Sequence, residues 1–305
     1  KSSSILYSNS LLSTSFIIFL ICGMDFTGAV NHALSTVSAG GFSTYNESAA
    51  YFDDVYVEGW MTFFMVLAGG NFGLYYRAYH KGAAVLLKDT EFKAYLSILV
   101  VAAIIIIGDL MVELDSDFFT ALRYAAFQTA SIATTGFVSA DYDRWPVLSK
   151  FVLMGLMICG GCAGSTAAGL KISRVVILFR SVRSTVLHLL YPKHVVEVMM
   201  NGTTLHDSTV LRVGQYFFMY IFFILFFALL LAFDGVGGFD ALGISVSTMG
   251  CIGPAFGVTG ATCTYADLSW FSKTVICFSM LLGRLEIFTI LVMLRPGLWK
   301  GKNTW

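Results

Sequence analysis

Charge and proline are scarce in this sequence. Only 12% of its 305 residues are charged and 4 are proline, whereas 57% are hydrophobic. Because a soluble domain carries about 25% charged residues, this composition excludes a soluble enzyme and a disordered tail. Basic and acidic residues number 19 each, so the net charge of zero provides no basic surface for nucleic acid. The composition therefore predicts an all-α integral membrane protein.

Patterns for disulfides, metals and cleaved leaders are also lacking. Cys159 and Cys162 form a Cys-x-x-Cys pair, but it lies in an apolar run with no second Cys or His pair nearby. The five histidines show no metal spacing. We interpret the cysteine pair as small packing residues of a membrane helix and predict no bound cofactor. The first apolar run has no basic segment beyond Lys1 and no small-residue cleavage site, so we expect no cleaved signal peptide.

Six apolar runs are long enough to cross a bilayer, which takes about 20 residues. The runs are Ile5–Met24, Tyr56–Tyr79, Ala94–Leu114, Val147–Phe179, Leu211–Phe233 and Trp270–Leu294. The fourth is too long for one helix and contains a string rich in glycine and alanine from Gly160 to Gly169. Glycine weakens a helix, and irregular backbone survives in a membrane only where protein or a water-filled cavity surrounds it. We therefore expect a broken helix at this position.

Basic residues predict the orientation. Lysine and arginine concentrate in residues 75–93, in residues 171–212 and in the C-terminal tail, whereas the other connections are acidic. The basic connections are expected on the cytoplasmic side. The acidic connections then face outward, where they would concentrate cations near an entrance.

Each outward connection contains a half-length amphipathic segment that ends at a glycine. The glycines are Gly41, Gly136 and Gly253. Five positions before each glycine stands a hydroxyl residue: Thr36, Ser131 or Thr248. A second aligned site follows in each copy, at Gly69-Gly70, Gly160-Gly161 and Gly283-Arg284. The chain is thus predicted to contain three copies of one unit (helix, half-helix, extended loop, helix), in residues 1–82, 83–190 and 191–305.

Such a half-helix suits a cation. A segment of about 12 residues cannot span the bilayer, so it enters and leaves on one side. Its unpaired C-terminal carbonyls and dipole then point toward the middle of the membrane. The following glycine permits backbone angles that turn carbonyl oxygens inward, and rings of such oxygens can replace the hydration shell of an alkali ion. The alternative is ordinary outer loops with glycine turns, which three registered copies disfavour.

These strings resemble the filter sequences of the Trk/Ktr/HKT superfamily of cation transporters. The strings are Ser38-Ala-Gly-Gly41-Phe42, Ala133-Thr-Thr-Gly136-Phe137 and Cys251-Ile-Gly253-Pro254. The interrupted helix Gly160–Leu170 resembles the intramembrane loop of that family, and Leu281–Glu286 resembles its last pore-lining helix with a buried arginine. The string His188–His194 is most similar to the TrkH branch, the potassium uptake proteins.

The resemblance implies a pore of four repeats around a pseudo-fourfold axis in a bacterial inner membrane, with potassium as the transported ion. Only three repeats are visible, so we expect a fragment that lacks the first repeat. The implied filter residues are Ser38, Ala39, Gly40, Gly41, Ala133, Thr134, Thr135, Gly136, Cys251, Ile252 and Gly253. Their backbone alone would hold potassium. Because the selectivity-deciding residue lies in the absent repeat, a sodium-conducting or sodium-dependent Ktr/HKT-like transporter is the alternative.

The gate implied by the resemblance consists of the interrupted helix and a buried arginine. Its residues are Gly160, Gly161, Gly164, Gly169 and Arg284. A charge near the centre of an apolar span costs at least ~2.5 kcal/mol, so Arg284 should face the pore or a partner. The alternatives are close helix packing through the glycines and an ion pair of Arg284 with Glu286 or another residue of the bundle.

The resemblance also implies partners, namely a second copy in a homodimer and a cytosolic nucleotide-binding ring like TrkA. No residue distinguishes passive flow from symport. We predict no enzymatic activity. Gly108-Asp109 with Tyr142-Asp143 resembles an intramembrane aspartyl protease only faintly, since that family requires a glycine where Ile106 stands. A purely structural membrane subunit is a further alternative.

Overall fold

Helices make up most of the residues that the structure describes. The computed structural model describes residues 2–191, 197–293 and 295, with side chains from residue 7 onward. Within these residues the helices form three successive sets, with one short hairpin between the second and third. The string His188–His194 and the basic C-terminal tail lie partly outside the described residues.

Each set contains a half-helix between two longer stretches of helix. The first set consists of α1 (Ser2–Ile21), α2 (Phe26–Val37), η1 (Ser48–Phe52), α3 (Val55–Gly69), α4 (Phe72–Lys81) and α5 (Ala84–Lys88). The second consists of α6 (Thr90–Glu113), α7 (Phe118–Thr134), η2 (Tyr142–Arg144), α8 (Val147–Cys159) and α9 (Ile172–Leu190). The antiparallel hairpin is β1 (Met199–Met200) and β2 (Thr203–Thr204). The third set consists of α10 (Asp207–Phe233), α11 (Gly238–Met249), η3 (Gly257–Thr259), η4 (Tyr265–Asp267), α12 (Trp270–Leu285) and α13 (Ile287–Met293).

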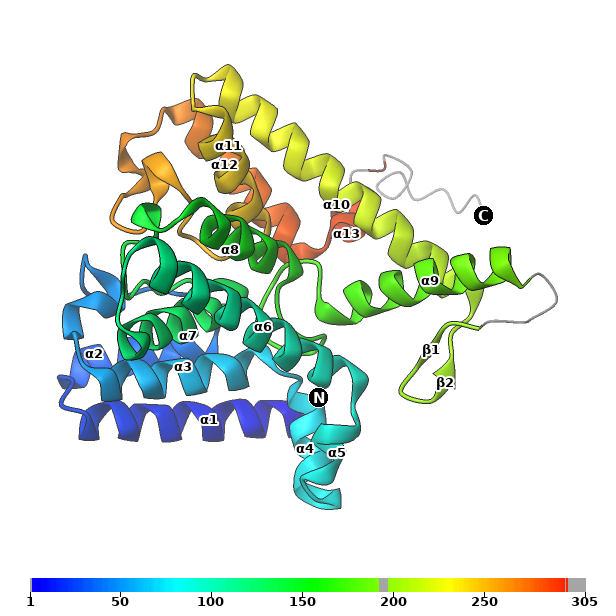
Figure 1. Cartoon of the computed structure of the whole chain (residues 1–305), viewed down its shortest axis with the longest axis horizontal. Helices are drawn as coiled ribbons and strands as arrows, with labels where there is room; N and C mark the ends of the chain where they lie inside the picture. The colour runs from blue at the N-terminus through cyan, green and yellow to red at the C-terminus, as the bar shows by residue number, and fades with distance from the viewer. Residues whose placement is uncertain (1, 192–196, 294, 296–305) are drawn as a thin grey trace.

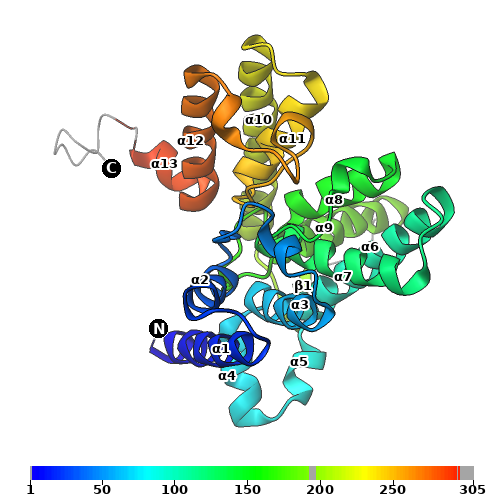
Figure 2. The same cartoon turned by 90° about the vertical axis from the view of Figure 1, so that its left-hand side faces the viewer.

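The three sets lie around a common centre, as Figure 2 shows for the blue α1–α3, the green α6–α8 and the yellow to orange α10–α12. Within each set the half-helix (α2, α7 or α11) contacts both neighbouring helices. Between sets, α3 contacts α7 and α8 contacts α11, so the same pairing recurs. The chain therefore has the predicted all-α fold of repeated helix–half-helix–helix units.

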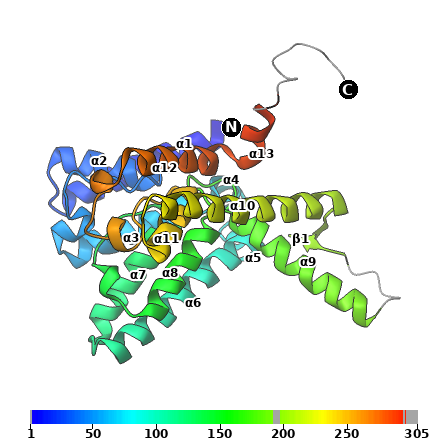
Figure 3. The same ribbon diagram turned by 90° about the horizontal axis from the view of Figure 1, so that it is seen from above.

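The two ends of the molecule differ. In Figure 1 the loop after α2 lies at one end of the long axis, whereas α9 and the hairpin lie at the other. Figure 3 shows α9 projecting beyond the rest of the helices at this second end. The segments α4–α5 and α9, which carry most of the described basic residues of the two predicted cytoplasmic connections, lie away from α2 (Figure 1).

Aspartates begin the first two half-helices. Asp25 accepts a hydrogen bond from the N–H of Gly28 at 3.1 Å, and Asp117 accepts one from that of Phe119 at 3.1 Å. Each carboxylate satisfies an unpaired N–H group at a helix N-terminus, where the helix dipole favours negative charge. Part of the acidity predicted for the outer connections thus serves to start these helices.

Two of the predicted spans are broken where a continuous helix was expected. The run Tyr56–Tyr79 is α3 and α4, separated at Gly70 and Asn71. There the hydroxyl of Tyr75 donates to the carbonyl of Leu67 at 2.9 Å, and Asn71 caps α4. The run Trp270–Leu294 bends by 106° between α12 and α13. The bend is at Glu286, whose positive φ of 61° cannot continue a right-handed helix.

Length and composition identify the helices that can cross a membrane alone. Among the described residues, α6 and α10 are long and apolar enough, and α12 with α13 makes a third if the bent pair counts as one span. The remaining apolar helices, such as α3 and α8, are shorter. The described residues thus contain two or three stretches that could each cross a membrane, as expected of a membrane protein.

Candidate ion filter and gate

Each half-helix ends in an exit segment with a similar turn. We define the exit segments as residues 38–42, 135–137 and 250–254. The N–H groups of Gly40, Gly136 and Ile252 donate to the carbonyls of Ser35, Ser131 and Ser247 at 2.8, 2.8 and 3.0 Å. Such bonds over five residues satisfy carbonyls that a helix end leaves unpaired. The half-helices thus stop at equivalent places and release the chain in extended form.

A buried serine ties each exit segment back to its half-helix. The hydroxyl of Ser35 accepts from the N–H of Phe42 at 2.6 Å. Those of Ser131 and Ser247 donate to the carbonyls of Phe137 and Pro254 at 2.5 and 2.8 Å. Only in the second copy is the bonded serine, Ser131, also the hydroxyl residue predicted five positions before the glycine. In the other two copies the serine stands one position earlier, because the chain from the serine to the glycine is one residue longer there.

The exit segments contact one another at Gly41 and Gly136. Gly41 has a φ of 68°, and a Cβ there would lie 2.5 Å from the carbonyl oxygen of Thr135. Gly136 has a φ of 104°, and a Cβ there would overlap the carbonyl oxygen of Ile252. A Cβ at Gly253 would meet no atom of the described residues within 4 Å. Backbone therefore touches backbone from the first copy to the second and from the second to the third.

The other predicted filter residues have different surroundings. Ser38 caps α2, and Ala39 and Cys251 adopt positive φ values of 55° and 52°. Ala133 and Thr134 belong to the last turn of α7 and are buried, so they lie before the extended part. The hydroxyl of Tyr265 donates to the carbonyl of Gly253, which gives that oxygen a partner within the protein.

Outer residues that the sequence did not single out support these segments across the copies. Ser48 and Ala50 of η1 hydrogen-bond to the backbone of Val138, at 3.1 and 3.0 Å. The hydroxyl of Tyr142 donates to the carbonyl of Ala255 at 2.8 Å and is fully buried. The outer loops of the first and second copies thus hold the residue that follows the exit segment of the next copy.

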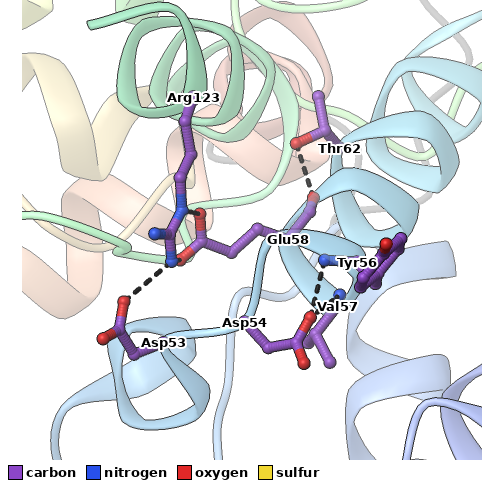
Figure 4. Close-up of polar contacts among 7 residues, drawn as sticks. All are labelled: Asp53, Asp54, Tyr56, Val57, Glu58, Thr62 and Arg123. Carbon is purple, nitrogen blue, oxygen red and sulfur yellow. Dashed lines mark hydrogen bonds and ion pairs between the residues drawn. The ribbon is translucent and has the colours of Figure 1, made fainter. Parts of the chain in front are cut away.

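An ion pair joins the first set to the second half-helix. Arg123 of α7 makes a two-pronged contact with Glu58 of α3, at 2.7 and 2.9 Å, and a further contact with Asp53 at 2.9 Å (Figure 4). The side chain of Glu58 is only 3% exposed. Asp54, next to this cluster, caps α3 through the N–H groups of Tyr56 and Val57. Helix α7 is therefore anchored to α3 at its outer half.

The interrupted helix forms a loop that reaches the end of the first half-helix. We call residues 160–171 the gate loop. The hydroxyl of Thr166 donates to the carbonyl of Val37, in the last turn of α2, at 2.9 Å. The N–H of Cys162 donates to the carbonyl of Gly69 at 2.8 Å. Because the backbone leaves the helix at Gly160, Cys162 is a buried loop residue and not the helix residue we predicted.

Glycines close the neck of the gate loop. Gly160, Gly164 and Gly169 have φ values of 68°, 80° and 85°. A Cβ on Gly160 would overlap the carbonyl oxygen of Ala168, and a Cβ on Gly169 would lie 3.0 Å from the Cα of Gly160. Gly161 is packed against Ala167 and the carbonyl of Gly69. Since this stretch is not helical, helix packing through these glycines does not describe it.

Arg284 contacts the gate loop directly, although its side chain is exposed in this structure and not buried as predicted. Its guanidinium donates to the carbonyl of Thr166 at 2.9 Å. Glu286, the alternative partner, instead pairs with Arg174 at 2.7 Å. Arg284, Thr166 and Lys171 line a cavity of about 340 Å³ next to the loop. Thr166 thus contacts both Val37 of the first set and Arg284 of the third, so the gate loop and the predicted gate arginine lie together.

The two aspartates of the protease alternative have separate partners. Asp109 accepts from the N–H and the hydroxyl of Ser149, at 2.9 and 2.5 Å. Asp143 accepts from the N–H of Gly257 at 3.1 Å. Burial raises the pKa of Asp143, which lies in an outer loop. Each carboxylate thus serves a local structural contact.

Comparison with known proteins agrees with this geometry. The TrkH family model, described as a cation transport protein, matches residues 14–301. The chain is 34% identical over 297 residues to the Trk system potassium uptake protein TrkH of Halomonas elongata, covering 95% of this chain and 60% of that protein. It is 32% identical over 304 residues to TrkG of Escherichia coli, covering 96% and 60%. The crystal structure of the potassium transporter TrkH from Vibrio parahaemolyticus superposes with a TM-score of 0.88 at 30% identity, covering 95% and 63%. The chain thus spans about three fifths of the length of these relatives.

Proposed function

The chain belongs to the TrkH family of cation transport proteins, and from this premise we propose that it forms three repeats of a pathway for potassium uptake. The observation that carries the proposal is the backbone contact of the exit segments at Gly41, Gly136 and Ile252. Carbonyl groups brought together in this way can replace water around an alkali ion. The family description, a cation transport protein, also agrees with the prediction that the chain is not an enzyme.

The gate loop and Arg284 would control passage below the filter. The contact of Thr166 with Val37 supports this role, because it holds the loop against the end of α2, next to the first exit segment. The guanidinium of Arg284 adds a positive charge to the same place, which opposes a cation electrostatically. We assign Gly160, Gly161, Gly164 and Gly169 the role of permitting the folded loop.

The remaining expectations extend the proposal to the whole protein. It would reside in the bacterial inner membrane, pair with a second copy and dock a TrkA-like nucleotide-binding ring. Arg183 of α9 is exposed on the projecting helix and is available to such a ring. Potassium would need no ligand besides the filter backbone. The unit boundaries at residues 82 and 190 follow from the repeat and remain predictions.

Ion flux tests the proposal. The full-length protein is placed in sealed liposomes with potassium or sodium as the sole permeant ion. Potassium flux should far exceed sodium flux and should rise by on the order of tenfold in Arg284→Ala, because one charged hydrogen bond to the gate loop is lost. Lys273→Ala, which removes a half-buried lysine in the first turn of the same helix that bonds to the carbonyl of Ala266, serves as the control.

The other outcomes are equally informative. Comparable or larger sodium flux would assign the protein to the sodium-conducting alternative. No flux of either ion from correctly folded protein, with its cytosolic partner present, would overturn the transport proposal. An unchanged flux in Arg284→Ala would overturn the barrier role alone.

A further inference from the structure

One buried carboxylate holds both ends of the gate loop. Glu91, in the first turn of α6, is 6% exposed. Its Oε1 atom accepts from the N–H of Ala163 at 2.5 Å and from that of Ser173 at 3.1 Å. Ala163 lies near the start of the loop, and Ser173 follows it in the first turn of α9. A single oxygen therefore ties the descending and returning chains together.

Opening the loop requires these bonds to break. A buried carboxylate that loses its donors is strongly disfavoured, and hydrogen bonds to an ionised acceptor are roughly twice as strong as neutral ones. Of the other contacts of the loop, those of Thr166 with Val37 and of Cys162 with Gly69 are neutral hydrogen bonds to backbone carbonyls, whereas Arg284 is a charged donor to the carbonyl of Thr166. Glu91 is thus the charged acceptor among these contacts, placed to favour the folded loop.

The hairpin reaches the same turn of α6 from the inner end of the molecule. Asn201 and Gly202 form its turn with φ values of 50° and 81°, the signature of a tight hairpin turn. The side-chain amide of Asn201 donates to Asp89 at 2.9 Å, and its oxygen accepts from the N–H of Thr90 at 2.8 Å. The hairpin also contacts α9, because the carbonyl of Met199 in β1 accepts a hydrogen bond from Arg180.

We propose that Glu91 is a positioning residue that latches the gate loop in its folded state, and that the hairpin steadies this latch through Asn201. The inference rests on the proposed gating function and names residues that regulate it. Movement of the hairpin or of α9 would shift Asp89 and Thr90, which stand two and one residues before Glu91. Because Ala163 and Ser173 belong to the second copy's own broken helix, such a shift loosens the loop without touching the exit segments.

The test compares potassium flux through the full-length protein in liposomes. Glu91→Ala should raise the maximal flux by on the order of tenfold, because the charged acceptor is lost. The half-saturating potassium concentration and the potassium-to-sodium ratio should stay unchanged, since the exit segments are untouched. Glu91→Gln keeps an oxygen in place but not the charge, so its flux should lie between that of the wild type and that of Glu91→Ala. Asn201→Ala should raise flux in the same direction by a smaller factor.

Controls separate this inference from the proposed function. Glu113→Ala, at the other end of α6, should leave flux unchanged. Flux in Glu91→Ala equal to or below that of the wild type overturns the latch, even where Arg284→Ala confirms the gate. Should Glu91→Ala fail to fold, Glu91→Gln decides alone: increased flux supports the latch and unchanged flux overturns it. Absence of flux in every variant and in the wild type refutes the proposed transport instead.

Discussion

Gly136 is the most constrained residue of the exit segments. Its φ of 104° lies in a region that residues with a Cβ rarely adopt, and the space where that Cβ would stand is occupied by the carbonyl oxygen of Ile252. The neighbouring copy therefore imposes the glycine as strongly as the local backbone does. Replacing it changes the position of an oxygen that the proposed pathway uses.

Gly136→Ala should both destabilise the protein and lower its flux. Backbone strain of this kind costs about 1–3 kcal/mol, and displacement of the Ile252 carbonyl adds to it. Potassium flux per folded molecule should fall at least tenfold in liposomes, with loss of selectivity over sodium. Gly155→Ala in α8 is the matched control, because its Cβ would enter open space and alanine favours a helix. Equal flux per folded molecule in the two variants would contradict the role of Gly136.

At the scale of elements, the helix breaks before α9 and α13 have the same backbone geometry. Lys171 (φ 75°, ψ 132°) directly precedes α9, and Glu286 (φ 61°, ψ 132°) directly precedes α13. In the first set, Asn71 precedes α4 with an ordinary extended conformation. The second and third copies thus resume their helices through the same left-handed step. Lys171 and Glu286 both line the cavity next to the gate loop.

The sequence predicts the half-helices and the gate loop because their signals are local. Runs of glycine and a repeated register are visible without a structure, as at Gly136 and Gly160. The break at Glu286 was not predicted, since neither glycine nor proline marks it. Glu91 was missed because its partners Ala163 and Ser173 lie 72 and 82 residues away. The hairpin at Asn201-Gly202 was not predicted, although this residue pair is a local hairpin signal.

The junction between α10 and α12 should depend on pH. Hydroxyl groups of Ser269 and Ser272 donate to Asp234, the first of them also capping α12, and they lower the pKa of this carboxyl. Since the folded pKa lies below the unfolded value of about 3.9, the contact stabilises the fold above that pH. Its contribution is lost as the pH falls through the folded pKa.

Thermal unfolding in detergent measures this dependence. The melting temperature of the wild type should exceed that of Asp234→Asn at pH 6, and the difference should shrink as the pH is lowered below about 4. Asp267→Asn, in the same outer connection, should show no such convergence. A difference that stays constant from pH 6 to pH 3 would show that the charge of Asp234 does not matter.

At the scale of the whole molecule, the three sets depend on one another. The residue after the second exit segment and the residue after the third are held by an outer loop of the preceding copy, Val138 by Ser48 and Ala255 by Tyr142. The ion pair of Glu58 with Arg123 makes the same connection between α3 and α7. A change at such a contact should therefore affect the position of a neighbouring copy and not only its own.

Removing Arg123 tests this dependence, because it leaves the buried Glu58 without its cation. Breaking a buried pair costs about 3–5 kcal/mol, so Arg123→Ala should lower the free energy of unfolding by that amount. Glu58→Met combined with Arg123→Met should recover much of the loss, since no buried charge then remains. Arg144→Ala removes an exposed pair with Asp141 and should cost about 0–1 kcal/mol. If Arg123→Ala were as mild as Arg144→Ala, α7 would be held by apolar packing alone. If Arg123→Ala instead lost both stability and selectivity, the ion pair between the first two sets would be what keeps Gly41 against Thr135.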